Sequence, residues 1–381
     1  MIVQAPTEWE GGTTVNSEEN TAEPVRECVL IDLNTIKPRA VEWIEKPYFA
    51  RGEFHVIQGQ GGSYKGTMCF TWASEFSKRG EHALLILAED DLATKVKPAL
   101  MAMGADMQFI HPLVLRCGEN EDAIILPNDL PILEREIMKI NATFVDIDPL
   151  LSHVSGNLDS YRDHDMKRCL TQVSKVAQRT RAAILGVHHT KKDTTGGLKL
   201  AGQASTAIYT TARVLLTMAK ISEEQAVMEV TKSNLGAEGV RQLLNADIVT
   251  VGTDEKTGLP IETPILTRGG ESPVSAQEAI NGQQKDAQTK TVKAAIRMLD
   301  ILEEEGEQKQ AALFERVAEE TGLTTGTVKR KVYWDILMEE DLVHGRKENQ
   351  FTGNWLVTRS AVARPKKLQV GGHTSEETEI C

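Results

Sequence analysis

The segment GQGGSYKGT, Gly59 to Thr67, lies between a predicted strand and a predicted helix. In such a setting a glycine-rich loop lets backbone N–H groups and a helix N-terminus surround phosphate groups. Lys65 would reach the β- and γ-phosphates, and the glycines allow a close approach of the backbone. The segment therefore predicts a nucleotide site made of Gly59, Gly61, Gly62, Ser63, Tyr64, Lys65, Gly66 and Thr67.

The match to the phosphate-loop pattern GxxxxGK[ST] is imperfect. Tyr64 stands at the last glycine, and Gly66 stands at the hydroxyl residue that binds magnesium. Because Thr67 carries the next hydroxyl, we expect it to take the metal role. A glycine-rich strand-to-helix turn with a chance lysine is the alternative interpretation.

Polar residues also end the later predicted strands. Glu89–Asp91 follow one strand, where a carboxylate could polarise an attacking water. Asp148 ends the strand TFVDID, as a magnesium-water site requires, and His188–His189 end the next strand at the same edge. Arg213 and Lys232 sit on later strands and could contact the γ-phosphate of a neighbouring subunit. Each residue also has an ordinary reading as a helix cap or a surface group.

These residues depend on a predicted α/β fold. Short runs rich in Val, Ile and Leu alternate with amphipathic stretches, which indicates a mainly parallel sheet with helices on both faces. The predicted strands are 53–59, 82–90, 113–119, 143–151, 182–190, 212–219, 226–234 and 247–251. The predicted helices between them are 67–80, 129–141 and 165–180.

The chain of 381 residues is long enough for more than one domain. Residues 1–28 read as an acidic, disordered tail, 29–268 as the α/β domain and 269–288 as a polar linker. Residues 289–360 read as a second, small domain, and 361–381 as a flexible tail.

Composition excludes several classes of protein. The five cysteines are far apart, which indicates reduced thiols rather than disulfides or a zinc site. No apolar run is long enough to span a bilayer and no signal peptide is visible, so we expect a cytoplasmic protein without membrane contact. With a formal net charge of −12, the chain is no generic nucleic-acid coat, although one channel or helix can still bind DNA.

From about Trp43 to Ser233 the chain resembles the RecA-fold ATPases of the RepA type, hexameric replicative helicases of plasmids and phages related to DnaB helicases. The resemblance rests on the order and spacing of several blocks. They are GQGGSYKGT, LLILAEDDLATKVKPALMAMGAD, VDIDPLLSHVSGNLDSYRDHDMKRCLTQVSKVA, ILGVHHTKK, GQASTAIYTTARVLLT and TKSNLG.

The resemblance implies a role for each matching position, with ATP and Mg²⁺ as cofactors. Lys65 is similar to the phosphate-binding lysine, Glu89 to the catalytic carboxylate and Asp148 to the acid that holds the magnesium water shell. His189 is similar to the γ-phosphate sensor. Arg213 and Lys232 are similar to the arginine finger and a second basic element at the subunit interface.

The same resemblance implies contacts with DNA. Residues 152–163 and 191–205 would face the pore of a ring, with Lys191, Lys192 and Lys199 as phosphate contacts. We therefore expect a homo-oligomer, a hexameric ring, on single-stranded and duplex DNA, in the cytoplasm of a bacterial host.

The C-terminal segment predicts two helices, a turn, a longer helix over 323–343 and a strand-like end, the outline of a winged helix-turn-helix. Lys329, Arg330 and Lys331 lie near the start of the third helix, the end that enters a major groove. The acidic runs Glu303–Glu305 and Glu319–Glu320 leave the module near neutral, so a protein-docking role is the alternative.

The whole pattern favours an ATP-dependent DNA helicase or translocase of phage or plasmid replication, with a replication loader or primase as a further partner. Two alternatives stay open. One is a DNA-binding initiator or regulator that uses ATP as a switch with little turnover, and the other is a recombinase-like filament protein.

Overall fold

The computed structural model describes residues 30–117, 120–155, 163–190, 206–348, 355–362 and 368. The chain divides into two units, Met1–Ala40 and Val41–Cys381. In the first unit the described residues contain one short 3₁₀ helix, η1 (Leu33–Thr35), which the Asp32 side chain caps. All other elements belong to the second unit.

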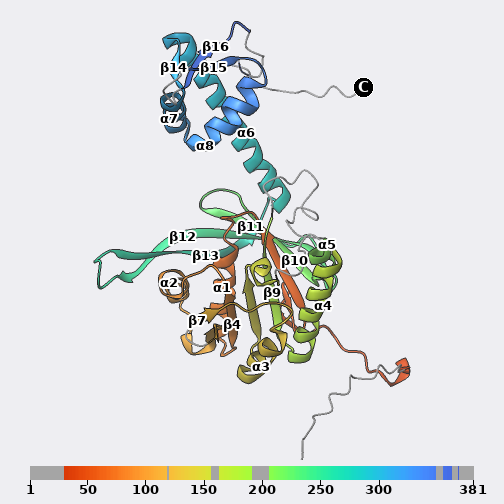
Figure 1. The fold of residues 1–381 in the computed structure, drawn as a ribbon. Helices are drawn as coiled ribbons and strands as arrows, with labels where there is room; N and C mark the ends of the chain where they lie inside the picture. The colour runs from red at the N-terminus through yellow and green to blue at the C-terminus, as the bar shows by residue number, and fades with distance from the viewer. Residues whose placement is uncertain are drawn as a thin grey trace, which may run out of the picture. The chain divides into compact units, whose positions relative to one another are not determined.

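A nine-stranded sheet forms the centre of the second unit, in the order β13-β12-β11-β10-β3-β9-β8-β4-β5 (Figure 1). Six neighbouring strands are parallel: β10 (Val214–Lys220), β3 (Phe54–Gly59), β9 (Ala183–His189), β8 (Phe144–Asp148), β4 (Ala83–Leu87) and β5 (Ile110–Pro112). Three antiparallel strands extend it: β11 (Gln225–Ser233), β12 (Arg241–Thr253) and β13 (Pro260–Glu271). The predicted α/β class with a mainly parallel sheet is confirmed. The arrangement of the strands is that of a RecA-like P-loop fold.

Helices cover both faces of this sheet. α1 (Lys65–Ser77) and α2 (Lys97–Ala102), which follows the helical turn η2 (Leu92–Val96), pack into one hydrophobic cluster with strand residues such as Leu85 and Val187. α3 (Leu130–Ile140), α4 (Asp163–Thr180) and α5 (Thr206–Thr211) pack into a second cluster with Val145 and Ile184. The parallel strands are buried on both sides, which explains their continuous apolar sequences.

The strand register brings several chain segments to one edge of the sheet. Gly59 at the end of β3 pairs with His189 at the end of β9. Leu87 at the end of β4 pairs with Asp148 at the end of β8. Polar groups just beyond these strands therefore meet, as is usual for ligand sites of open α/β sheets.

One predicted strand lies elsewhere. Of residues 113–119, Leu115–Cys117 form β6, which pairs with β7 (Asn120–Asp122) in a separate hairpin. The edge of the main sheet is β5 instead. A further pair, β1 (Trp43–Glu45) and β2 (Phe49–Ala50), precedes β3, and two 3₁₀ turns, η3 (Met107–Phe109) and η4 (Leu150–His153), complete the domain.

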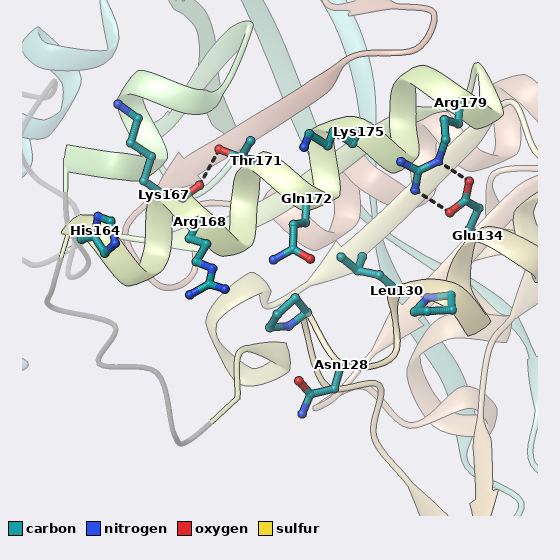
Figure 2. Close-up of a pocket in the computed structure, with 12 residues that line it drawn as sticks. Asn128, Leu130, Glu134, His164, Lys167, Arg168, Thr171, Gln172, Lys175 and Arg179 are labelled. Atoms are coloured by element: carbon teal, nitrogen blue, oxygen red, sulfur yellow. Dashed lines mark hydrogen bonds and ion pairs between the residues drawn. The ribbon is translucent and has the colours of Figure 1, made fainter. Parts of the chain in front are cut away.

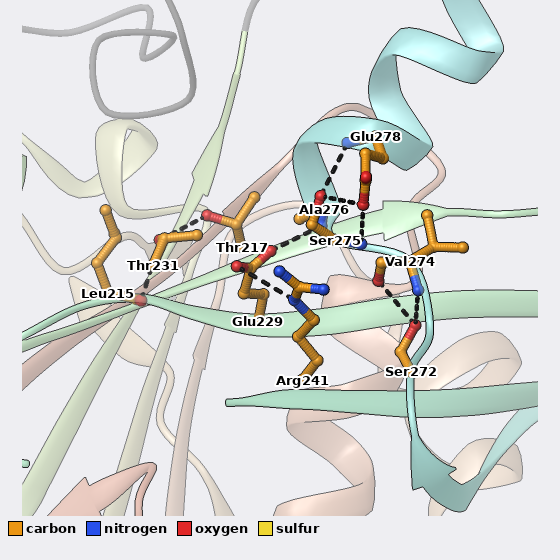
Figure 3. A network of polar contacts seen from close by, with 10 residues as sticks. All are labelled: Leu215, Thr217, Glu229, Thr231, Arg241, Ser272, Val274, Ser275, Ala276 and Glu278. Carbon is orange, nitrogen blue, oxygen red and sulfur yellow. Dashed lines mark hydrogen bonds and ion pairs between the residues drawn. The ribbon is translucent and has the colours of Figure 1, made fainter. Parts of the chain in front are cut away.

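The long helix α6 (Ala276–Glu305) begins directly against the sheet (Figure 3). Ser275 and Glu278 form a capping box, and the backbone N–H of Ala276 donates to Glu229 of β11 at 2.7 Å. Arg241 of β12 lies 3.7 Å from the same carboxylate. The hydrogen bonds to Glu229 and Ser275 satisfy the N–H groups of Ala276 and Glu278 in the first helical turn.

The expectation of a linker over 269–288 is corrected by this helix. β13 continues to Glu271, and α6 occupies the segment from Ala276 onward. Although the segment is polar, Ala279 and Ile280 recur at helical spacing and are buried with Ala219 and Val227. That small apolar stripe packs on the sheet, and together with the cap it anchors the start of α6 there.

Residues beyond the middle of α6 form a small α/β part with its own core. It contains α7 (Gln310–Thr321), α8 (Thr325–Thr327) with the continuous helical segment η6 (Val328–Met338), and strands β14 (Gln308–Lys309), β15 (Val343–Lys347) and β16 (Trp355–Arg359) in the order β14-β16-β15. Met298, Phe314 and Tyr333 are buried in its core. Over the described residues, no helix is both long and apolar enough to cross a membrane.

Candidate nucleotide site

Lys65 is the first residue of α1 and is almost fully buried, with 4% of its surface exposed. Its Nζ donates to the carbonyl oxygens of Gly59 at 3.0 Å and Gln60 at 2.9 Å, and it lies 3.4 Å from Ser63 Oγ. Burial lowers the pKa of Lys65 to about 8, against the opposing effect of the nearby Asp148 carboxylate. The loop thus holds the Lys65 ammonium group next to the N-terminus of α1. Phosphate oxygens are the natural partners of this ammonium group and of the backbone N–H groups at the helix N-terminus.

The glycines of the loop have different structural roles. A Cβ at Gly59 would lie 2.3 Å from the Met218 carbonyl oxygen, so the loop can run against β10 only with glycine at this position. Gly62 has φ +77°, which side chains rarely adopt. Gly61 has open space around it and an ordinary φ.

Tyr64 takes the conformation that the sequence pattern reserves for glycine, with φ 66°. Two contacts hold it there: its hydroxyl donates to the Glu223 carbonyl at 2.6 Å, and Lys220 Nζ lies 4.7 Å from the ring centre. A left-handed residue with a Cβ costs about 1–2 kcal/mol, which a hydrogen bond of about 1 kcal/mol and a cation–π contact can offset. The substitution at position 64 therefore preserves the shape of the loop.

Two carboxylates converge above the start of α1. A Cβ at Gly66 would lie 3.2 Å from Asp148 Oδ2 and 4.0 Å from Asp90 Oδ2. Burial, followed by the charge of Asp90, raises the pKa of Asp148 to about 6. Asp90 also forms an ion pair with Lys95.

This donor set fits Mg²⁺, which proteins bind through one or two carboxylates together with substrate phosphates and water. The described residues contain no group of three or more His, Cys, Asp or Glu side chains that would cage an ion by themselves. Asp148 and Asp90 would hold the ion, and the space left by Gly66 is where the usual hydroxyl would stand. Thr67 is half-buried, and its metal role remains a prediction.

Glu89 and His189 flank the same edge. Glu89 is exposed just beyond β4, and its charge acts on both Asp148 and His189. Burial and the charge of Lys65 lower the pKa of His189, and Glu89 opposes this shift. Lys65, Glu89, Asp148 and His189 therefore form one electrostatic group, as the sequence predicts.

Arg213 and Lys232 lie at the opposite edge of the sheet. Arg213 directly precedes β10, its N–H donates to the Phe54 carbonyl at the start of β3, and its side chain pairs with Glu53 at 3.3 Å. Lys232 donates to the carbonyls of Tyr209 at 2.5 Å and Ala212 at 2.7 Å. Neither residue can act on the Lys65 of its own chain, and their expected contact with the γ-phosphate of a neighbouring subunit stays a prediction.

The structure adds residues that the motif did not single out. The sequence pointed to the run Glu89–Asp91 without distinguishing Asp90. Only the structure, which places Asp90 beside Gly66, identifies it as a candidate metal-binding residue. Asp146, two residues before Asp148, is fully buried beside the Cys69 thiol, and burial raises its pKa strongly. Lys220 has no signal in the sequence, because its contact with Tyr64 joins distant segments.

The predicted DNA contacts fall into two groups. Lys191, Lys192 and Lys199 lie outside the described residues. Lys329, Arg330 and Lys331 follow one another on η6 and are all exposed.

Comparison with known proteins agrees with this geometry. The model of a family described as an AAA domain matches residues 19–195. A search of curated proteins finds no match. The matched segment contains the loop, Glu89, Asp148 and His189, and it supports an AAA-type P-loop ATPase domain that binds nucleotide.

We predict that Gly59→Ala abolishes nucleotide binding and lowers the melting temperature, because its Cβ would clash with the Met218 carbonyl. Gly61→Ala is the matched control for the melting temperature, since no protein atom lies within 4 Å of a Cβ there. Thermal unfolding and nucleotide titration of the two variants check this. Equal behaviour of both variants would contradict the close approach of loop and strand.

We predict that the affinity for Mg·ADP is highest between pH 6 and 8, because the pKa of Asp148 is raised to about 6 and that of Lys65 is lowered to about 8. Below pH 6 Asp148 gains a proton and loses its charge for the metal, and above pH 8 Lys65 loses the charge that attracts phosphate. Calorimetric titration from pH 5 to 9 measures the profile.

Asp148→Asn serves as the reference for this profile. The phosphates of the nucleotide titrate in the same way with the variant, so a difference between the two profiles reports on Asp148 alone. The acidic fall should be steeper in the wild type than in this variant, and chelating the magnesium should remove the difference. Identical acidic limbs with magnesium present would exclude Asp148 as the metal-binding acid.

Proposed function

We propose that the chain is an ATP-dependent DNA helicase or translocase of the RepA type, which hydrolyses ATP between subunits. The observation that supports this most is the division of polar groups between two edges of one sheet. Lys65, Glu89, Asp148 and His189 gather at one edge, while Arg213 stands at the other. A finger at the far edge can act only on a neighbouring copy.

Each residue then has a task that its position allows. The loop N–H groups and the Lys65 ammonium bind the phosphates and neutralise charge. Magnesium, when bound, supplies charge stabilisation to the β- and γ-phosphates. Asp148 orients its water shell, and Glu89, exposed at the edge, orients the attacking water and accepts its proton.

His189 links the site to the loop that follows β9. The charge of Lys65 acts on His189, and the segment that the resemblance implies to face a pore begins at residue 191, two positions after the end of β9. As a γ-phosphate sensor, His189 would pass the loss of that phosphate to this segment. Its lowered pKa keeps the ring neutral at pH 7, so it would report by hydrogen bonding.

The remaining parts of the proposal concern assembly and DNA. The copies would form a closed ring, a hexamer, around single-stranded DNA in a bacterial cytoplasm. The C-terminal helices α7, α8 and η6 with their three-stranded sheet would be a winged helix that binds duplex DNA through Lys329, Arg330 and Lys331, or docks a loader or primase.

Gly66 favours a second candidate, an initiator or regulator that uses ATP as a switch with little turnover. Position 66 is the one beside Asp148, so the glycine leaves that acid without the hydroxyl that normally completes the metal site. A water molecule in place of the hydroxyl would still allow ATP to bind but would slow its hydrolysis.

We predict steady-state ATP hydrolysis that single-stranded DNA stimulates and that Lys65→Ala abolishes, because the ammonium neutralises the transferred phosphate. A phosphate-release assay with and without a poly-dT oligonucleotide measures it. Tight ATP binding without turnover in the wild type would reject the motor in favour of the switch.

We predict that Arg213→Ala lowers hydrolysis about 10³-fold or more and leaves ATP affinity nearly unchanged, since a finger in trans stabilises only the transition state. Mixing this variant with Lys65→Ala should restore activity, because about a quarter of the interfaces in a random ring then carry both groups. Normal hydrolysis by Arg213→Ala, or no rescue on mixing, would reject the shared site.

A further inference from the structure

A wide groove lies away from the nucleotide site, between α4 and the segment that leads into α3 (Figure 2). Its volume is about 860 Å³. The residues that line it are Pro127, Asn128, Leu130, Pro131, Glu134, His164, Lys167, Arg168, Thr171, Gln172, Lys175 and Arg179. α3 and α4 pack on the face of the sheet opposite to α1, so this groove and the Lys65 site are separate.

One face of α4 supplies the basic side of the groove. His164, Arg168, Lys175 and Arg179 recur at intervals of four, seven and four residues, which places them on one side of the helix. The other side is buried in the domain core through Leu170 and neighbouring residues. From residue 164 to 179 the row extends over about 22 Å of helix, the length of an extended polymer segment rather than of a small ligand.

The positive charge of the α4 side chains that line the groove, Lys167 included, is largely uncompensated among the described residues. Arg179 forms a two-pronged ion pair with Glu134, the one carboxylate among the described lining residues, at 2.6 Å for each bond. Lys167, Arg168 and Lys175 are exposed, and no ion pair involves them within the described residues. A run of three free cations is notable in a chain whose formal net charge is −12.

The rest of the lining bears on the kind of partner. Asn128 and Gln172 add amide donors, which commonly contact phosphate oxygens. Among the described lining residues, His164 carries the one aromatic ring and Leu130 is only 5% exposed, so this part of the lining offers no large apolar anchor of the kind on which protein interfaces centre. The lysine, arginine and amide groups favour contacts with phosphates over contacts with base edges.

We propose that this groove binds the sugar-phosphate backbone of a nucleic acid, independently of its sequence, through Lys167, Arg168 and Lys175. The ion pair between Arg179 and Glu134 joins α4 to α3 at the end of the row and so holds that end of the groove in place. The choice of nucleic acid rests on the proposed function, but binding in the groove requires no ATP hydrolysis. The groove is a further contact surface, distinct from the predicted loops and from η6.

The test measures binding of fluorescent poly-dT and of a duplex to the full chain without nucleotide, by anisotropy at several salt concentrations. The variant Lys167→Ala/Arg168→Ala/Lys175→Ala should bind poly-dT about 10–100-fold more weakly at low salt. Three lost phosphate contacts should also reduce the slope of log affinity against log salt by about 2.

A matched control removes three exposed cations outside the groove, Arg135→Ala/Lys139→Ala/Lys256→Ala. It makes the same change in net charge and should keep the wild-type affinity. Unfolding curves confirm that both variants fold, and Lys175→Glu alone provides a milder change with the same expected direction.

Three results would overturn the proposal. If the groove variant and the control bind poly-dT equally, DNA binds elsewhere and the proposed function survives. If the wild type binds neither oligonucleotide, both the groove proposal and the DNA part of the proposed function fail, whatever the ATPase rate. If only poly-glutamate binds, and does so through the groove, the partner is an acidic protein segment.

Discussion

The buried ammonium group of Lys65 is the constraint around which the ATPase site is arranged. A charge with 4% exposure needs polar partners, and it has the carbonyls of Gly59 and Gln60, with Ser63 Oγ nearby. Those partners come from the loop itself, so the loop must curl around the start of α1. The curl brings Gly59 against the Met218 carbonyl, where only glycine fits. Asp148 then sits close enough to support the positive charge.

The same loop is connected to more distant parts of the chain. Tyr64 contacts Glu223, in the turn between β10 and β11, and Lys220, at the end of β10. The Lys220 carbonyl accepts a hydrogen bond from Gln283 of α6 at 2.8 Å. A side chain in the phosphate loop is thus two contacts away from the helix that continues into the C-terminal part. Gln58, just before the loop, donates a hydrogen bond to the Thr217 hydroxyl. The Thr217 hydroxyl is also hydrogen-bonded to that of Thr231, as Figure 3 shows.

Local patterns in the sequence predicted what depends on local structure. The apolar runs gave β3, β4, β8 and β9, and the phosphate-loop motif placed Lys65 at a helix start. Arg213 lies at the other edge because it stands at the start of a parallel strand, whereas the place of Lys232 depends on the antiparallel pairing of β11 with β10, which a single sequence does not show. The start of α6 was missed because its stripe is short and is buried only in the folded protein. Asp90 and Lys220 gain their meaning from neighbours far along the chain, and so do the basic residues of α4.

The central claim is that this loop binds a nucleoside triphosphate through Lys65, with Asp148 in support and despite the glycine at position 66. Isothermal titration of ATP into the full chain, with and without magnesium, tests it most directly against Lys65→Ala. The account requires saturable binding, strengthened by magnesium, that weakens at least about 100-fold in the variant, since a buried charge-assisted contact to phosphate is lost. Equal ATP affinity in the two proteins, or none in the wild type, would contradict it.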